Sequence, residues 1–268
     1  MDKPVILMLC NNAHNQIALA NKMHTSLGID HIIVENKITN RKLSLQNIWN
    51  KLRYKTIDDA WFAMLSFYKN KFPAFPATNV SFTIDINSAE TESIIKTLKP
   101  DLILVSGTRI IKNNIIGINP PLGIMNMHTG LSPFVNGGPN CTNWCIALNK
   151  FHLIGNTIMW LDAGIDSGNI ITTSQVDFTG NETLTDLQIK VMEHAHQLYI
   201  VAAKAVIANK NSVNNIPQKS ISTGNTYYTK MWTSKQKKDL LQNFKHFANV
   251  IKSESYLQNK NKIKTIPL

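Results

Sequence analysis

Apolar and polar residues alternate along the chain with two different spacings. Short apolar runs bounded by turn-forming residues predict strands, and stretches in which apolar residues recur every three to four positions predict helices. Strands that alternate with helices are typical of an α/β protein. The predicted strands are residues 4–10, 29–36, 79–86, 101–107, 123–128, 155–162 and 169–178. The predicted helices lie within residues 11–28, 43–70, 87–100, 139–150 and 183–209.

The continuous apolar run DLILVSG at residues 101–107 indicates a strand that is covered on both faces, as in a parallel sheet. The sequence therefore predicts a doubly wound, mainly parallel sheet within a domain that spans residues 1–210. After Lys210 the chain becomes polar and rich in turn-forming residues, and a lysine-rich stretch with helical character follows. We predict a small basic C-terminal region at residues 211–268, formed by a hairpin and a helix.

The positive charge of the chain is concentrated near its C-terminal end. The chain has 28 Lys+Arg and 17 Asp+Glu residues, a net charge of +11. Residues 201–268 contribute 12 Lys, against only Asp239 and Glu254. Such a region can bind the phosphates of a polynucleotide or of a nucleotide diphosphate, or it can be a solvated lysine-rich face. Charge alone leaves these alternatives open.

The composition is that of a globular protein with a sizeable core, since 43% of the residues are hydrophobic. No apolar run approaches the roughly 20 residues of a membrane-spanning helix, and we expect a cytoplasmic protein. The three cysteines, Cys10, Cys141 and Cys145, are an odd number and lack the paired spacing of metal ligands. We therefore expect buried thiols, with neither a disulfide framework nor a metal site.

Two polar side chains interrupt the apolar strand at residues 123–128. Asn126 and His128 lie two residues apart, so they project from the same face of the strand. They come at its carboxyl end, where ligands bind in parallel α/β sheets. The alternative is a buried histidine with a purely structural role near the following turn.

A second group of polar residues occurs in the segment GNTIMWLDAGIDSGNII, residues 155–171. It contains Asp162 and Asp166, four residues apart, together with glycines that allow close approach of the backbone to a ligand. A carboxylate, an imidazole and an amide suit proton transfer and stabilisation of an oxyanion. Because the sequence has no Walker loop, no G-x-G-x-x-G motif and no nucleophile elbow, we expect direct transfer without a covalent enzyme intermediate. The alternative is an acidic loop that only forms a turn.

The segments NMHTGLSP (residues 126–133) and GNTIMWLDAGIDSGNII resemble the folate-dependent formyltransferases. This family has Asn-x-His before a Ser/Leu-Pro turn and a G-x-T…D-x-G-x-D-x-G signature, and the resemblance extends over residues 79–178. The family includes glycinamide ribonucleotide transformylase, methionyl-tRNA formyltransferase and the nucleotide-sugar N-formyltransferases. Asn136 departs from the arginine of many relatives, which weakens inference about the acceptor, and Asn156 replaces a small or apolar residue.

The resemblance implies a Rossmann-like formyltransferase fold and 10-formyltetrahydrofolate as the formyl donor, with no metal. It implies that Asn126 and His128 face the formyl carbonyl, and that Asp166 orients His128 or relays a proton with it. The residues that it implies for the folate pocket are Arg109, Ile110, Ile111, Asp162 and Ile165.

The expected acceptor is the amine of a nucleotide-linked amino-deoxysugar, dTDP-4-amino-4,6-dideoxyglucose being the best expectation, for surface polysaccharide (O-antigen, lipopolysaccharide) synthesis. About 60 residues follow Lys210, which is few for the tRNA-binding barrel of the tRNA enzymes, and nucleic acid is not the favoured partner. The helical segment 43–70 has no place in the smaller purine-pathway enzyme.

Methionyl-tRNA formyltransferase stays an alternative because of the basic region, and a non-catalytic folate- or nucleotide-binding module is another. The apolar content of residues 221–232 is compatible with a homodimer. Tyr227, Tyr228 and Trp232 are expected to bind the acceptor, but each of them can instead pack on the core or on a second subunit. The residues expected to bind the acceptor are His14, Asn15, Gly137, Gly138, Tyr227, Tyr228 and Trp232.

Overall fold

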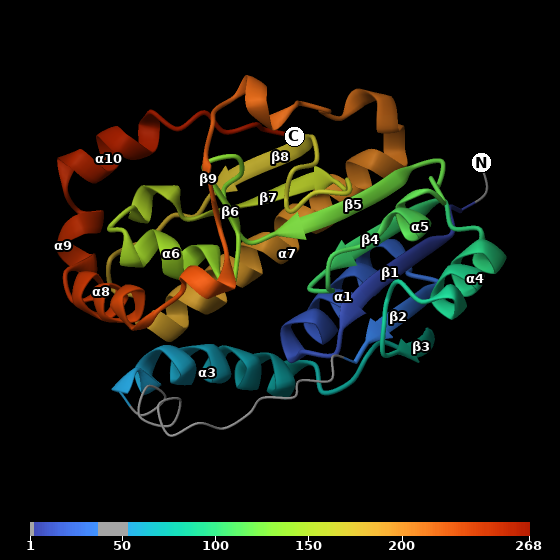
Figure 1. Cartoon of the computed structure of the whole chain (residues 1–268), viewed down its shortest axis with the longest axis horizontal. Helices are drawn as coiled ribbons and strands as arrows, with labels where there is room; N and C mark the ends of the chain where they lie inside the picture. Colours follow the sequence, from blue (N-terminus) through green and yellow to red (C-terminus); the bar gives the residue numbers. More distant parts are fainter. Residues whose placement is uncertain (1–2, 37–52) are drawn as a thin grey trace.

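The computed structural model describes residues 3–36 and 53–268. Its centre is a seven-stranded sheet with the order β3-β2-β1-β4-β5-β7-β8 (Figure 1). Neighbouring strands from β3 to β5 are parallel, while β7 is antiparallel to both β5 and β8. The predicted mainly parallel α/β sheet is confirmed. The strands are β1 (Ile6–Asn11), β2 (His31–Glu35), β3 (Asn79–Thr83), β4 (Leu102–Ser106), β5 (Gly123–His128), β7 (Gly155–Trp160) and β8 (Ile170–Gln175).

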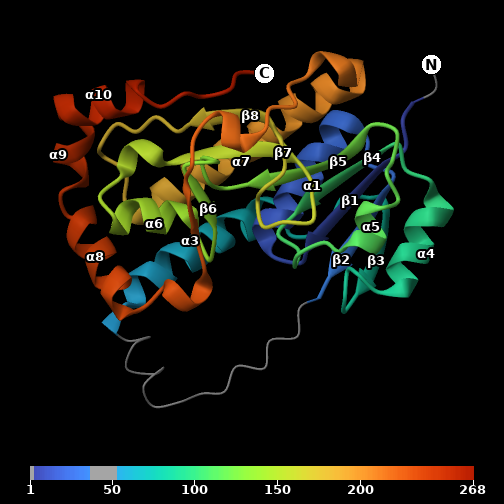
Figure 2. The ribbon, with the colours of Figure 1, turned by 45° about the horizontal axis from the view of Figure 1, so that its top comes forward.

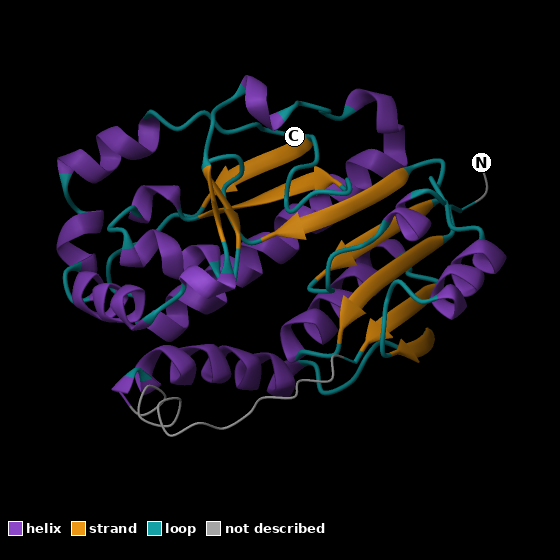
Figure 3. Ribbon diagram, viewed as in Figure 1, coloured by secondary structure: helices purple, strands orange, loops and turns teal. Residues whose placement is uncertain are grey.

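Helices cover both faces of the sheet (Figure 3). Helices α1, α3 and α7 contribute to the hydrophobic core on one face, and α4 and α5 contribute to the core on the other. The predicted helix at residues 43–70 is described from Lys55 onward, and its first part lies outside the described residues. These helices, with α6, are α1 (His14–Leu27), α3 (Lys55–Lys71), α4 (Ala89–Leu98), α5 (Asn113–Ile116), α6 (Cys141–Ala147) and α7 (Leu184–Asn209).

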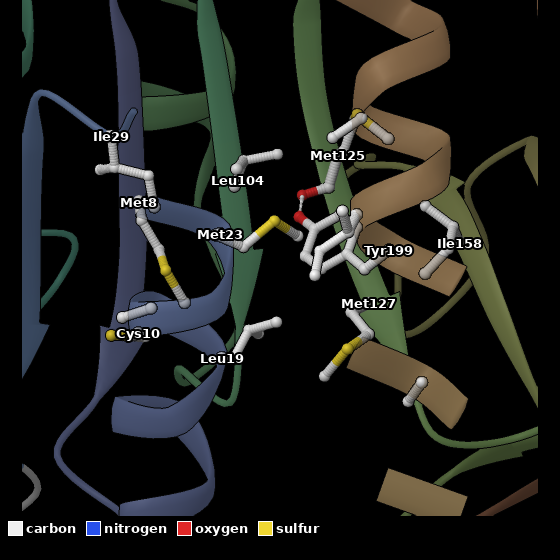
Figure 4. Packing of buried hydrophobic residues seen from close by; sticks show 14 of the residues in the cluster. Met8, Cys10, Leu19, Met23, Ile29, Leu104, Met125, Met127, Ile158 and Tyr199 are labelled. Carbon is white, nitrogen blue, oxygen red and sulfur yellow. Dashed lines mark hydrogen bonds between the residues drawn. The ribbon is translucent and has the colours of Figure 1, made fainter. Parts of the chain in front are cut away.

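Alternate residues of the central strands enter two separate hydrophobic cores. On β1, Met8 and Cys10 pack against α1 and α7, whereas Leu7 and Leu9 face the side of α4 and α5. Figure 4 shows part of the first core, to which the methionines of β5 also belong. Burial on both faces explains why these strands read as continuous apolar runs. The three cysteines are free and buried, as expected.

A buried tyrosine links β4 to β5 near the carboxyl ends of these strands. The Tyr199 hydroxyl on α7 donates to the Met125 carbonyl oxygen at 2.7 Å and accepts from the Val105 N–H at 2.9 Å. Figure 4 shows its side chain between the two strands, beside Met125. Because Val105 is paired with Asn126 in the register of the sheet, Tyr199 supports the strands directly beside the first candidate side chain.

The C-terminal region differs from the predicted hairpin and helix. Strand β9 (Asn225–Tyr227) pairs in parallel with β6 (Val135–Gly137), from the middle of the chain. The backbone N–H and C=O groups at the edge of β6 are hydrogen-bond partners for β9, so β9 does not need a partner strand that is adjacent in the sequence, as a hairpin would supply. Helices α8 (Ser234–Phe244), α9 (Phe247–Ile251) and α10 (Glu254–Asn261) follow. Short 3₁₀ helices lie at Phe151–Leu153, Lys210–Ser212, Gln218–Ser220 and Thr229–Met231.

The C-terminal helices pack closely on the rest of the protein. Leu240, Phe247 and Ile251 share one hydrophobic cluster with Cys145 and Ile146 of α6. A boundary near residue 210 stays a prediction. Within the described residues, no helix combines the length and the apolar character needed to cross a bilayer.

Replacing Tyr199 with phenylalanine should lower the free energy of unfolding by about 1–3 kcal/mol, because the buried Val105 N–H and Met125 carbonyl lose their shared partner. Urea denaturation followed by circular dichroism measures this change. Tyr228→Phe is the control, since Tyr228 is 46% exposed, and it should change the free energy of unfolding by no more than about 0.5 kcal/mol. Equal losses in the two variants would contradict the linking role of Tyr199.

Candidate active site

A cavity of about 430 Å³ opens at the carboxyl ends of β1, β4 and β5. It lies where the strand order reverses, because β2 and β4 are placed on opposite sides of β1. Open α/β sheets bind ligands at such a switch point. The loop between β7 and β8 and parts of α1, α3 and α7 complete the wall.

Asn126 and His128 line this cavity from the end of β5. The methionines beside them enter the core behind the sheet, so that the alternation of the strand turns the amide and the imidazole to the opposite face. His128 is only 8% exposed. Its Nδ1 lies 3.3 Å from Asp166 Oδ2, and its Nε2 lies 3.3 Å from the Val135 carbonyl oxygen. A protonated imidazole can donate to both of these oxygens.

Gly130 and Cys141 close the space around the His128 ring. The Cys141 Sγ lies 3.5 Å from His128 Nε2 and 3.3 Å from the Gly137 carbonyl oxygen. A Cβ atom on Gly130 would lie 2.3 Å from the same ring nitrogen, so a larger residue would displace the ring. No group of three His, Cys, Asp or Glu side chains in the described part of the chain is placed to hold a metal ion.

Asp166 belongs to the loop between β7 and β8, drawn in yellow in Figure 2. Its φ of 49° is in the left-handed region, which residues other than glycine rarely adopt. Besides facing His128, its Oδ2 accepts from the Gly137 N–H at 3.0 Å. Asp162 accepts instead from the Gly164 N–H and the Ser167 hydroxyl. The two carboxylates thus differ: Asp166 pairs with the imidazole, and Asp162 shapes the loop.

The surroundings of His128 favour its charged form. Burial by itself lowers the pKa of His128, but the Asp166 carboxylate, the Cys141 sulfur and the Val135 carbonyl raise it, to about 10 in balance. Burial also raises the pKa of Cys141, so this side chain is a neutral thiol at pH 7. Asp166 is therefore the charge that keeps His128 protonated. An imidazolium of this kind can stabilise negative charge on a bound ligand.

All five residues expected at the folate line this cavity. The Arg109 guanidinium is paired with carboxylates, its Nε lying 2.5 Å from Glu35 Oε1 and its Nη1 3.6 Å from Asp85 Oδ1. Ile110 and Ile165 are 55% and 40% exposed, which is high for isoleucine. Apolar side chains beside backbone polar groups suit a flat heterocycle.

Only some of the residues expected at the acceptor reach the cavity. Asn15 and Gly137 line it, whereas His14 and Gly138 are not part of its lining. Further residues line it that were not expected from the sequence. Asn11 follows the first predicted strand directly, so the rule that ligands bind at strand ends could have identified it. The unexpected lining residues include Asn11, Gln16, Trp61, Ser106 and Met192.

The aromatic residues of the C-terminal region are used elsewhere. Tyr227 stacks on Trp144 with ring centroids 4.4 Å apart, and Trp232 packs against the same ring, edge to face, at 5.0 Å. Rings that pack on one another bury apolar area in a favourable geometry, and the structure thus corresponds to the core-packing alternative for this pair. Tyr228 is exposed and does not line the cavity.

The ion pair predicts how stability depends on pH. The folded pKa of His128, about 10, exceeds the ordinary value of 6.5, so its stabilising contribution is fully present below about pH 6.5 and is lost as the pH rises through about 10. The stability advantage of the wild type over Asp166→Asn should therefore shrink across this range. Free energies of unfolding of both proteins, measured from pH 6.5 to pH 10, test this. A constant difference would show that Asp166 does not hold the proton.

Comparisons with known proteins were made against a family model, curated sequences and solved structures. The formyl transferase family model matches residues 38–203. The methionyl-tRNA formyltransferase of Clostridium perfringens (strain SM101 / Type A) is 30% identical over 125 residues, 46% of this chain and 40% of that relative. The aligned part of the chain thus spans less than half the length of the curated relatives it matches.

Two solved structures show the same fold over most of the chain. A sugar N-formyltransferase from Shewanella sp FDAARGOS_354 has a TM-score of 0.58 at 13% identity, over 89% of this chain and 87% of the other. The N-formyltransferase from Helicobacter canadensis, in complex with folinic acid and dTDP-3-aminofucose, has a TM-score of 0.54 at 17% identity, over 91% and 81%. Because the family match covers more than half of the sequence and includes Asn126, His128 and Asp166, the chain belongs to the formyltransferase family.

Proposed function

We propose that this chain transfers the formyl group of 10-formyltetrahydrofolate to the amine of a nucleotide-linked amino-deoxysugar. The observation that carries the proposal is the convergence of Asn126, His128 and Asp166 in one cavity, with the imidazole 3.3 Å from the carboxylate. An amide donor beside an imidazolium suits the negative charge that develops when an amine attacks a carbonyl carbon. The donor supplies an activated formyl group, and the protein supplies position and charge.

The three side chains have different tasks in the proposed reaction. Asn126 and His128 donate to the formyl oxygen as its negative charge develops. Asp166 keeps His128 protonated and oriented. The amine nitrogen bonds to the formyl carbon and loses a proton, while the bond from that carbon to the folate nitrogen breaks and this nitrogen takes up a proton. The His128–Asp166 pair can relay one proton between the two nitrogens. Asp166 and Val135 fix the ring through its two nitrogens. One of the two ring N–H groups of His128 donates to the formyl oxygen in the proposed reaction. Both groups are in place before the substrates arrive.

The chemistry of the cavity lining suits two ligands of different character. Ile110, Ile111 and Ile165 provide apolar area for the ring system of a folate. Trp61 and Asn15 provide an indole ring and an amide for a second ligand, and the Asn15 Oδ1 is buried without a hydrogen-bond partner. A sugar ring has both the apolar face and the hydroxyl donors that would satisfy such groups.

The fold comparisons favour a nucleotide sugar as the acceptor. The matches to sugar N-formyltransferases extend over about 90% of this chain, so they include at least part of the segment after α7. One of these proteins was solved with a dTDP-linked amino sugar. This supports a dTDP-linked amino-deoxysugar as the class of acceptor. Within this class we propose dTDP-4-amino-4,6-dideoxyglucose, with surface polysaccharide synthesis as the destination of the product.

Methionyl-tRNA formyltransferase is the second candidate. The curated relatives with this name are 30–36% identical to the chain over 37–51% of its length. The basic C-terminal region is compatible with a polyanionic acceptor. An assay with both kinds of acceptor distinguishes the two functions.

The purified protein should release tetrahydrofolate, measured by absorbance, when it is mixed with 10-formyltetrahydrofolate and a dTDP-linked amino-deoxysugar. The panel contains dTDP- and UDP-linked 3-amino and 4-amino sugars, glycinamide ribonucleotide and methionyl-tRNA. Turnover with one amino sugar identifies the reaction and the acceptor together. Turnover with the tRNA alone would overturn the proposed acceptor, and no turnover with any member of the panel would overturn the proposed function.

His128→Asn and Asp166→Asn should each reduce kcat by about 10²–10³-fold or more, because each removes a group that stabilises or maintains the developing charge. Thermal unfolding at pH 7 shows whether each variant is folded. In a folded variant, activity within a few-fold of the wild type would remove that residue from the catalytic set.

A further inference from the structure

We propose that Gln218, from the segment after α7, is a positioning residue that holds the β7–β8 loop so that the Asp166 carboxylate stays against His128. This proposal rests on the proposed function of the same site. It assigns to the C-terminal region a part in the chemistry that neither its charge nor its aromatic residues provide.

The topology of the sheet makes the position of Asp166 demanding. Strand β7 is antiparallel to β5, with Thr157 opposite His128 and Trp160 opposite Met125. The strand therefore runs away from the carboxyl end of β5, and the loop that follows must turn back to bring Asp166 within 3.3 Å of the imidazole. Nothing in the strand pairing itself ensures this return.

Gln218 provides the contacts that hold the returning loop. Its side chain is 8% exposed, and its Nε2 donates to the Asp166 carbonyl oxygen at 2.7 Å and to the Gly168 carbonyl oxygen at 2.9 Å. Its Oε1 accepts from Asn136 Nδ2 at 3.3 Å. The NH₂ group of this buried amide thus donates to two backbone carbonyls of the loop, one of them that of Asp166 itself.

Asp166 is held at two points. Its carboxylate accepts from the Gly137 N–H of β6, and its carbonyl accepts from Gln218, which contacts Asn136 of the same strand. The left-handed backbone of Asp166 is unfavourable for an aspartate, and residues 162–165 before it are exposed. The Asp162 hydrogen bonds to Gly164 and Ser167 shape the loop on either side of Asp166, whereas the Gln218 donors act on the Asp166 carbonyl itself. Loss of these donors should therefore let the carboxylate move away from the ring.

Gln218→Met, similar in length but without donors, tests the proposal. The titratable groups that face His128 are Asp166 on the loop and Cys141 on α6. If the loop is released, the pKa of His128 should fall by about one unit or more, because the carboxylate is the charge that raises it. We expect kcat to fall by about tenfold or more, with the alkaline limit of the pH–rate profile shifted to lower pH.

Gln175→Met is the matched control. Gln175 Nε2 also donates to two backbone carbonyls, those of His152 and Lys260, but Gln175 does not line the cavity. This variant should lose comparable stability and keep the pH–rate profile of the wild type. Gln218→Leu, which also lacks the donors and adds no charge, is the second variant if the methionine variant does not fold.

A folded Gln218 variant with turnover within twofold of the wild type and an unchanged pH profile would overturn the positioning role. Titration of His128 by NMR gives a measurement that needs no substrate. An unchanged His128 pKa in both Gln218 variants would also overturn it. If no acceptor of the panel is turned over, the proposed function fails, while this titration still decides whether Gln218 positions Asp166.

Discussion

A buried imidazolium requires a carboxylate at a fixed place, and this requirement explains much of the structure around the cavity. Removing a charged group from water costs several kcal/mol unless a partner compensates for it. His128 is nearly inaccessible to solvent, and Asp166 is the partner that offsets the cost. The ring packs against Gly130 and Cys141, and the carboxylate is hydrogen-bonded to β6. A pair held in this way is charged and oriented before any ligand binds.

The position of the pair follows from the sheet. Parallel strands bring their carboxyl ends to one edge, which gathers Asn11, Ser106 and Asn126 around the cavity although they are far apart in the sequence. Strands β7 and β8, which are antiparallel and lie at one side of the sheet, add the loop that carries Asp166. The parallel part thus gives the cavity its floor, and the antiparallel part gives it a carboxylate.

Local patterns in the sequence are sufficient for the strands and for part of the site. Alternation along residues 123–128 places Asn126 and His128 on one face, and the structure has them there. The same reasoning could not show that Asp162 and Asp166 have different partners, because this depends on how the loop returns over β5. It could not place Tyr227 and Trp232 either, since the ring of Trp144 on which they pack belongs to a distant segment.

The net charge of +11 is a conspicuous feature of the composition, yet the cavity has no excess of unpaired positive charge among the described residues that line it. Among the described residues that line it, Arg109 and His128 are the basic ones, and each is paired with a carboxylate. Lysines of the C-terminal region lie outside this lining, and Lys235 and Lys260 have acidic partners of their own. Exposed charges act over roughly 8–10 Å at physiological ionic strength. Under the proposed function, the basic region attracts the anionic nucleotide sugar toward the protein, whereas the buried pair of His128 and Asp166 acts on the formyl group in the cavity.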